Sequence, residues 1–171
     1  MGIDRKAEQV IRTMLGHAMR HELDDLAALI GTAGKETLLR GLPLCLLASA
    51  YIAIDVSDRW PTEADLREIA KHASEAETEL DISEQVIYEY LSRVALGREK
   101  LDDVFPDEGI IPIPLYATAN LLLTFRPREK HWWEYLDQIW GAAETAERTS
   151  LTVLPALMLR ARRESASQEG E

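Results

Sequence analysis

The sequence predicts an all-α protein, an irregular or orthogonal array of about six to eight helices around a single layer-packed core. Apolar residues recur at spacings of three and four along nearly the whole chain, which gathers them on one side of a helix. Strand-like alternation is almost absent, since only residues 109–116 show it weakly and the two prolines there favour an extended lead-in to a helix. The 171 residues, 46% of them hydrophobic, suffice for one core.

Three helices are expected in the first third of the chain, and their predicted spans are 4–30, 35–41 and 43–56. Gly16 is the place where the first helix would break, and residues 31–34 are expected to form a loop. The apolar run at 42–54 is shorter than the roughly 20 residues that span a bilayer. We therefore expect a deeply buried core helix there and no contact with a membrane.

Capping signals mark the two helices that follow. Thr62 and Asp65 form a capping-box pattern. The helix that begins there is expected to have its inner face at Leu66, Ile69, Ala70 and Ala73. Asp81 and Glu84 repeat the capping pattern for the next helix, which is expected to end at Gly97. Its apolar stripe lies at Val86, Ile87, Tyr90, Leu91 and Val94.

The last part of the chain is expected to contain an acidic loop, three helices and a polar tail. The loop spans residues 102–109, and its acids lack the spacing of a calcium loop. Pro127 opens a Trp-rich helix and Pro155 lies within the final one, so the predicted spans are 114–125, 127–148 and 149–164. Because no repeat or long linker interrupts the chain, we expect one helical domain at 1–164 and a disordered tail at 165–171.

Composition narrows the class of protein. The formal net charge of −11 disfavours binding to nucleic acids and to anionic membranes, and favours basic partners. The single cysteine, Cys45, excludes an internal disulfide and a four-cysteine zinc site, and its apolar neighbours indicate a small buried side chain. The N-terminus lacks the hydrophobic region of a signal peptide, so a cytoplasmic protein is expected. Hydrolase motifs are absent, and no catalytic residue or cofactor is predicted.

Two patterns resemble ligand sites. Residues 31–37 resemble a phosphate-binding loop, but two residues separate the glycines where the motif has four, which favours a plain turn. His17 and His21 are four residues apart on one predicted helix, and Asp25 extends the same row. One helix supplies too few ligands, and His17 points away from the predicted core stripe. A solvated face is therefore favoured, and no metal is predicted.

Glu22 is a candidate binding residue. If the first helix is continuous, Glu22 falls inside its apolar stripe. A buried carboxylate costs several kcal/mol unless it is paired. We therefore expect Glu22 to pair with an arginine, within the chain or across an oligomer interface, unless a break at Gly16 changes the helix phase and exposes it.

The stretch at 62–96 resembles a helix-turn-helix motif in its two short amphipathic segments. The connection between the two predicted helices is longer than that motif uses. The second segment would present Glu84 and Glu89 to DNA against a single Arg93, whereas a DNA-reading helix needs donors and positive charge. DNA binding is therefore disfavoured.

The Trp-rich helix has an apolar arc of roughly 160°. The residues expected in the core are Trp132, Leu136, Ile139 and Trp140. Trp133 lies at the rim of this arc, beside Asp137 and Glu144. A tryptophan in that position is typical of the border of a pocket or an interface.

These features favour a non-catalytic cytoplasmic protein that acts through protein–protein binding and forms a homodimer. The alternative is a small-molecule-binding helical protein or enzyme with a pocket lined by the Trp-rich helix, and the third hypothesis is a helix-turn-helix regulator. A self-complementary apolar face would favour the first, a closed cavity the second and a basic stripe the third. The candidate binding residues are Trp133, Asp137, Trp132 and Glu22.

Overall fold

A computed structural model describes residues 4–96 and 112–148. These residues form seven helices and no strand, which confirms the all-α prediction. The helices are α1 (Arg5–Met19), α2 (Leu23–Ala33), α3 (Lys35–Ser57), α4 (Glu63–Ala76), α5 (Glu84–Leu96), α7 (Pro112–Phe125) and α8 (Trp132–Arg148). The expected acidic loop, the final helix, the tail and Gly97 lie outside the described residues.

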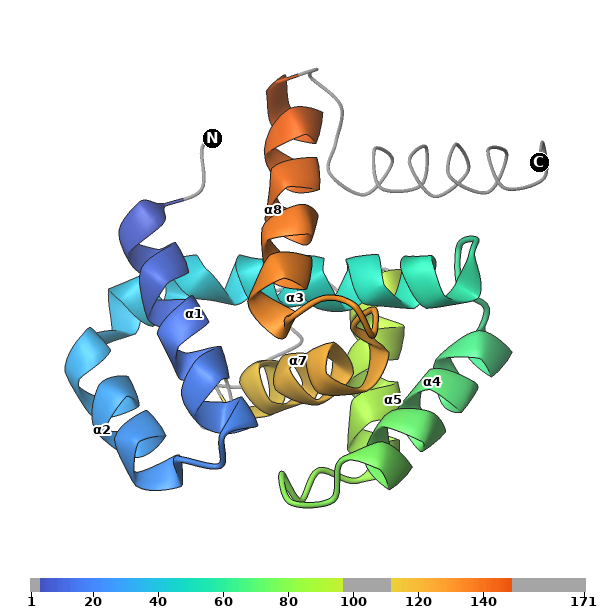
Figure 1. Cartoon of the computed structure of the whole chain (residues 1–171), viewed down its shortest axis with the longest axis horizontal. Coiled ribbons are helices and arrows are strands. Elements are labelled where there is room, and N and C mark those ends of the chain that lie inside the picture. The colour runs from blue at the N-terminus through green and yellow to red at the C-terminus, as the bar shows by residue number, and fades with distance from the viewer. Residues whose placement is uncertain (1–3, 97–111, 149–171) are drawn as a thin grey trace.

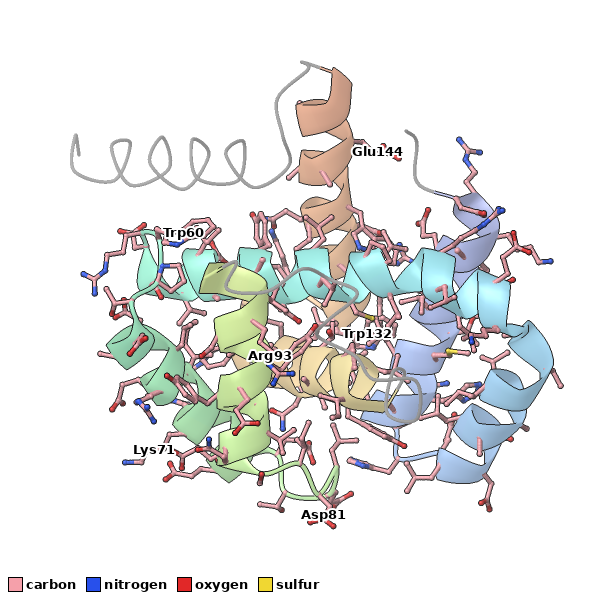
Figure 2. The ribbon with its side chains drawn as sticks, turned by 180° about the vertical axis from the view of Figure 1, so that it is seen from behind. Trp60, Lys71, Asp81, Arg93, Trp132 and Glu144 are labelled. Atoms are coloured by element: carbon pink, nitrogen blue, oxygen red, sulfur yellow. The ribbon has the colours of Figure 1, made fainter. Side chains whose placement is uncertain are left out.

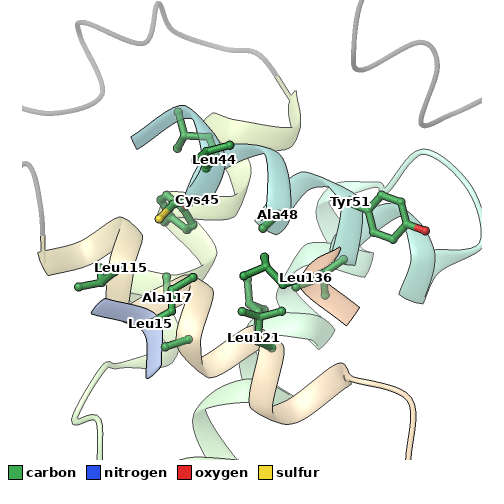
Figure 3. Close-up of a cluster of buried hydrophobic side chains, with 14 of the residues drawn as sticks. Leu15, Leu44, Cys45, Ala48, Tyr51, Leu115, Ala117, Leu121 and Leu136 are labelled. Atoms are coloured by element: carbon green, nitrogen blue, oxygen red, sulfur yellow. The ribbon is translucent and has the colours of Figure 1, made fainter. Parts of the chain in front are cut away.

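Helix α3 is the centre of the fold. It runs the length of the molecule, and α1 and α8 cross it steeply (Figure 1). It contacts each of the other six described helices. One core lies between these helices, and Figure 3 shows Leu15, Cys45, Leu121 and Leu136 meeting there from α1, α3, α7 and α8. The described helices therefore form the irregular array around one core that the sequence predicts.

The expected division of α3 into two helices is wrong. Helix α2 continues to Ala33, Gly34 alone makes the turn with φ of 81°, and α3 then runs unbroken through Pro43. Proline removes one hydrogen bond from the helix ladder. Thirteen buried residues of α3 hold the helix together on both sides of this defect. Tertiary packing thus overrides the local signal for a break.

The predicted burial of the apolar segment is confirmed. Helix α3 is long and apolar enough to cross a membrane by length and composition. In the fold, however, 72% of its most apolar stretch is buried against other helices. The core helix of a soluble protein has the same length and composition, so this property alone does not indicate a membrane span.

Helices α4 and α5 differ in how well their capping was predicted. At α4 both hydrogen bonds of the Thr62–Asp65 capping box form, and all four predicted inner residues are buried. At α5 the prediction was wrong, because the Ser83 hydroxyl accepts the N–H of Val86 at 3.3 Å and so caps the helix. Asp81 lies two residues earlier in a left-handed turn with φ of 49°. Asp81 and Ser83 both have side chains that can cap a helix, and Ser83 is the one that caps α5.

A buried polar chain joins α3, α5 and α7. Ser49 Oγ lies 3.1 Å from Tyr90 Oη and 3.0 Å from Thr118 Oγ1, and Thr118 donates to the carbonyl of Cys45 at 3.2 Å. Because each hydroxyl has one proton, Ser49 must donate to Thr118 and Tyr90 to Ser49. Burial raises the pKa of Tyr90 above its usual value and that of the Cys45 thiol to about 12. Both groups therefore stay neutral inside the core.

Candidate functional site

The α1–α2 corner differs from the prediction. Helix α1 ends at Met19, and the chain reverses through His21, which has a left-handed φ of 58°. The expected break at Gly16, and the alternative of a continuous helix, are both wrong. Gly16 is instead buried beside α8, where a methyl group on it would lie 3.2 Å from Nη1 of Arg20 and 3.5 Å from Cζ2 of Trp132.

Glu22 lies at the N-cap of α2 and not in an apolar stripe. Its carboxylate accepts hydrogen bonds from Nε and Nη2 of Arg20 at 2.9 and 3.0 Å. The Nδ1 of His17 lies 2.6 Å from Oε2, the carboxylate oxygen that also accepts from Nη2 of Arg20. The bonds from Arg20, and then the contact with His17, lower the pKa of Glu22 to about 2. The expected arginine partner therefore exists, and it belongs to the same chain.

The two histidines do not share one face. His17 points to Glu22, whereas His21 contacts the α4–α5 connection, with Nε2 3.1 Å from Glu79 and 3.9 Å from Glu77. The predicted row of His17, His21 and Asp25 is therefore wrong. The reversal of the chain brings a different set together, since ligand atoms of His17, Glu22 and Asp25 lie within 4.8 Å of one another.

Helix α8 begins at Trp132 and not at Pro127 as predicted. A turn precedes it, closed by the N–H of Lys130 donating to the carbonyl of Pro127 at 3.0 Å. The N–H of His131 then donates to the carboxylate of Glu134 at 2.7 Å. This bond satisfies a backbone donor at the helix start and fixes the direction of α8.

The inner face of α8 is core, as predicted for three of its four residues. Leu136, Ile139 and Trp140 are buried, whereas Trp132 is only partly buried. The indole N–H of Trp140 has no hydrogen-bond partner among the described residues. The guanidinium of Arg12, on α1, lies 4.7 Å from the ring centre of Trp140. Arg12 thereby covers the edge of the core between α1 and α8.

Polar contacts also attach α8 to α3. The Tyr135 hydroxyl donates to Asp55 at 2.6 Å, although the Tyr135 ring is fully buried. The amide of Gln138 donates to the Tyr51 hydroxyl at 3.0 Å, and the ammonium of Lys130 donates to Gln138. These bonds orient α8 on α3 in addition to the apolar contacts.

Trp133 lies at the rim of the core, as predicted. It is 43% exposed. Its ring stacks on His131, with 4.2 Å between the ring centres and 8° between the planes. Trp132 meets it edge-on, with 5.6 Å between the centres and 84° between the planes. Trp133 is therefore exposed to solvent but held in one orientation.

Exposed carboxylates share the side of α8 that carries Trp133. Helical spacing places five residues within an arc of about 100°. We call this arc the outer face of α8, and it consists of Trp133, Glu134, Asp137, Gly141 and Glu144, all exposed. Asp137 is paired with Arg12 at 2.5 Å and remains 61% exposed. Figure 2 shows Glu144 on the half of α8 that extends beyond the body of the fold.

The structure brings the four predicted site residues to adjoining places. Trp132, Trp133 and Asp137 lie along α8, and Glu22 lies at the α1–α2 corner. Arg20 connects the α1–α2 corner to α8. Its guanidinium binds Glu22, and it lies near Gly16 together with the ring of Trp132. Sequence reasoning missed Arg12, Arg20 and His131. Of these, His131 could have been found from its position next to the tryptophans, whereas Arg12 meets Asp137 across 125 residues.

The helix-turn-helix hypothesis gains no support from the second helix. Helices α4 and α5 pack against each other, but Glu84 and Glu89 are exposed on α5, as the sequence indicated. No protein-family model matches the chain, and neither a curated protein nor a solved structure was found to be significantly similar to it. The geometry of the outer face of α8 and the α1–α2 corner is therefore the basis for a functional proposal.

Proposed function

We propose that the protein is a non-catalytic cytoplasmic protein that binds another protein on the outer face of α8 and forms a homodimer. The observation that supports this best is Trp133, which is exposed yet held by His131 and Trp132. Tryptophan is enriched among the residues that dominate binding energy at protein interfaces. A ring that is already oriented loses little conformational entropy when a partner covers it.

Charge indicates the chemistry of the partner. Glu134, Asp137 and Glu144 lie on the same face as Trp133, and the chain as a whole carries a net charge of −11. A lysine or arginine can place its cation over the indole and pair with a neighbouring carboxylate. Gly141 leaves open space on this face, since nothing lies within 4 Å of where its Cβ would be. A basic segment of a partner protein fits these features.

The shifted pKa values of the described residues support binding over acid–base catalysis. The large upward shifts belong to Tyr90 and Cys45, which are sealed in the core. The large downward shift belongs to Glu22, which is held by Arg20. The two core groups are out of reach of a substrate, and Glu22, with its pKa of about 2, is a weak base at neutral pH.

Exposed apolar side chains support the homodimer. Leu23 on α2 is 50% exposed, and Leu39 on α3 is 45% exposed. Of the eleven residues of α2, the structure buries only Leu26. An isologous contact between two copies would remove such surface from water on both sides at once.

The binding proposal can be tested with an array of short arginine- and lysine-containing peptides, using fluorescence anisotropy with the full chain. We expect saturable binding that Trp133→Ala weakens roughly tenfold. Val56→Ala is the matched control, because Val56 is 41% exposed, close to the 43% of Trp133, but lies on α3. Peptides with glutamine in place of arginine and lysine should not bind. Equal binding to both variants, or no binding to any peptide, would overturn the proposal, and sedimentation of the parent chain tests the dimer separately.

A further inference from the structure

We propose that the α1–α2 corner is a zinc-binding site in which His17, Glu22 and Asp25 are the ligands and Arg20 is the cation that zinc displaces. This inference does not depend on the proposed function, because it concerns a different set of residues with its own chemistry. The proposal follows from the reversal of the chain at His21. This reversal brings the side chains of His17, Glu22 and Asp25 close together, whereas a continuous helix would spread them over several turns.

The distances suit a small cation. One ligand atom from each of the three residues lies within 4.8 Å of the others, and Nδ1 of His17 and Oε2 of Glu22, now hydrogen-bonded at 2.6 Å, have to move apart only slightly to admit the ion. In a tetrahedral zinc site the ligand atoms lie about 3.3 Å apart, given bonds of about 2.0–2.1 Å. Asp25 is exposed, so a rotation of its side chain can close the remaining gap. The fourth position would be open to water.

The ligand types favour zinc over magnesium or calcium. Zinc accepts both imidazole nitrogen and carboxylate oxygen as ligands, whereas magnesium and calcium prefer oxygen ligands alone. Two carboxylates and one neutral imidazole also balance the charge of Zn²⁺. Binding requires the Nδ1 lone pair of His17, so a proton on that atom must move to Nε2 or to solvent.

The guanidinium of Arg20 takes the place beside Glu22 that a zinc ion would take. Its Nε and Nη2 both donate to Glu22, and the pKa of Arg20 is raised chiefly by these bonds. Arg20 therefore stays charged, and zinc has to displace it from Glu22. An ion pair as exposed as this one contributes little stability, because water screens it and the side chain gains freedom on release. The competition between Arg20 and zinc gives the proposal a specific signature.

The test is calorimetric titration of Zn²⁺ into the full chain at neutral pH, with Mg²⁺ as the comparison ion. We expect one saturable zinc site and no magnesium site. His17→Gln and Asp25→Asn should each weaken binding roughly tenfold or more, and Arg20→Gln should strengthen it. His72→Gln is the matched control, because that histidine lies on α4 beside Phe125, outside the α1–α2 corner, and its loss should leave the affinity unchanged.

A second measurement separates lost ligands from lost folding. Thermal melts without zinc show whether each variant is folded, and Asp25→Asn leaves the contacts of Glu22 with Arg20 and His17 in place. Zinc should raise the melting temperature of the parent chain, since it joins the end of α1 to the start of α2. Absence of a saturable site in the parent would overturn the proposal. Equal weakening by His17→Gln and His72→Gln, or weaker zinc binding after Arg20→Gln, would also overturn it.

Discussion

The inner and outer faces of α8 are held by different forces. On the inner face Trp140 is 4% exposed and Tyr135 is fully buried, so removal from water fixes them. On the outer face Trp133 is fixed by stacking on His131, and Asp137 by its pair with Arg12. One helix thus carries residues that the fold needs and residues that a partner could use, and the two kinds can be changed separately.

Truncation of Trp140 should have the largest effect on stability. We expect Trp140→Ala to lower the free energy of unfolding by about 3–5 kcal/mol, because it loses the transfer energy of a buried indole and leaves a cavity. The measurement is urea denaturation followed by circular dichroism. A loss below about 1 kcal/mol would mean that α8 is not needed to close the core.

Removal of the Tyr135 hydroxyl should have an intermediate effect. Tyr135→Phe keeps the buried ring but removes the donor to Asp55, at a cost of about 1–2 kcal/mol. Asp55→Asn retains an acceptor and should cost less. If Tyr135→Phe unfolds at the same urea concentration as the parent, apolar contacts alone orient α8 on α3.

Truncation of Trp133 should cost about 1 kcal/mol or less, because the side chain is already partly in water. Sedimentation beside the parent chain shows whether its loss also changes self-association. Equal and large destabilisation by Trp133→Ala and Trp140→Ala would mean that both tryptophans are core residues. The binding role given to Trp133 would then be withdrawn.

The smallest effect on the free energy of unfolding is expected at the α1–α2 corner. There Arg20 lies beside Trp132 of α8 and binds Glu22. The pKa of Glu22 is lowered from 4.5 to about 2 in the folded chain. The ionised form is thus favoured by folding, and its contribution is present above pH 4.5 and lost as the pH falls toward 2. Urea denaturation between pH 4.5 and 2 should show a fall in the free energy of unfolding of the parent that Glu22→Gln does not share. If the two proteins lose stability in parallel, Glu22 is not paired with Arg20 and His17.

The sequence was informative where local signals decide the structure. The capping box at Thr62 and the inner face of α4 depend on residues within two turns of one another, and both were predicted correctly. The rim position of Trp133 followed from helical periodicity alone. The buried state of the apolar segment in α3 followed from its composition.

Contacts between distant segments could not be predicted. The end of α1 is fixed by His21 reaching Glu79 and by Trp132 covering Gly16, and both partners lie far along the chain. Helical periodicity alone permits a continuous helix, and a continuous helix would put Glu22 in an apolar stripe where the structure does not have it. The same error made a metal site appear short of ligands, because it placed Glu22 in the apolar stripe and not beside His17 and Asp25.

The close approach of α1 and α3 has a consequence for how the sequence can change. A methyl group at Gly41 would overlap Cγ1 of Ile11 and lie 2.8 Å from its Cδ1, and Ile11 is itself buried on all sides. Positions 11 and 41 therefore share a fixed volume. A larger residue at one is tolerated only with a smaller residue at the other, so neutral drift at this crossing should proceed by paired substitutions, with Gly41→Ala accepted in a background such as Ile11→Val or Ile11→Ala.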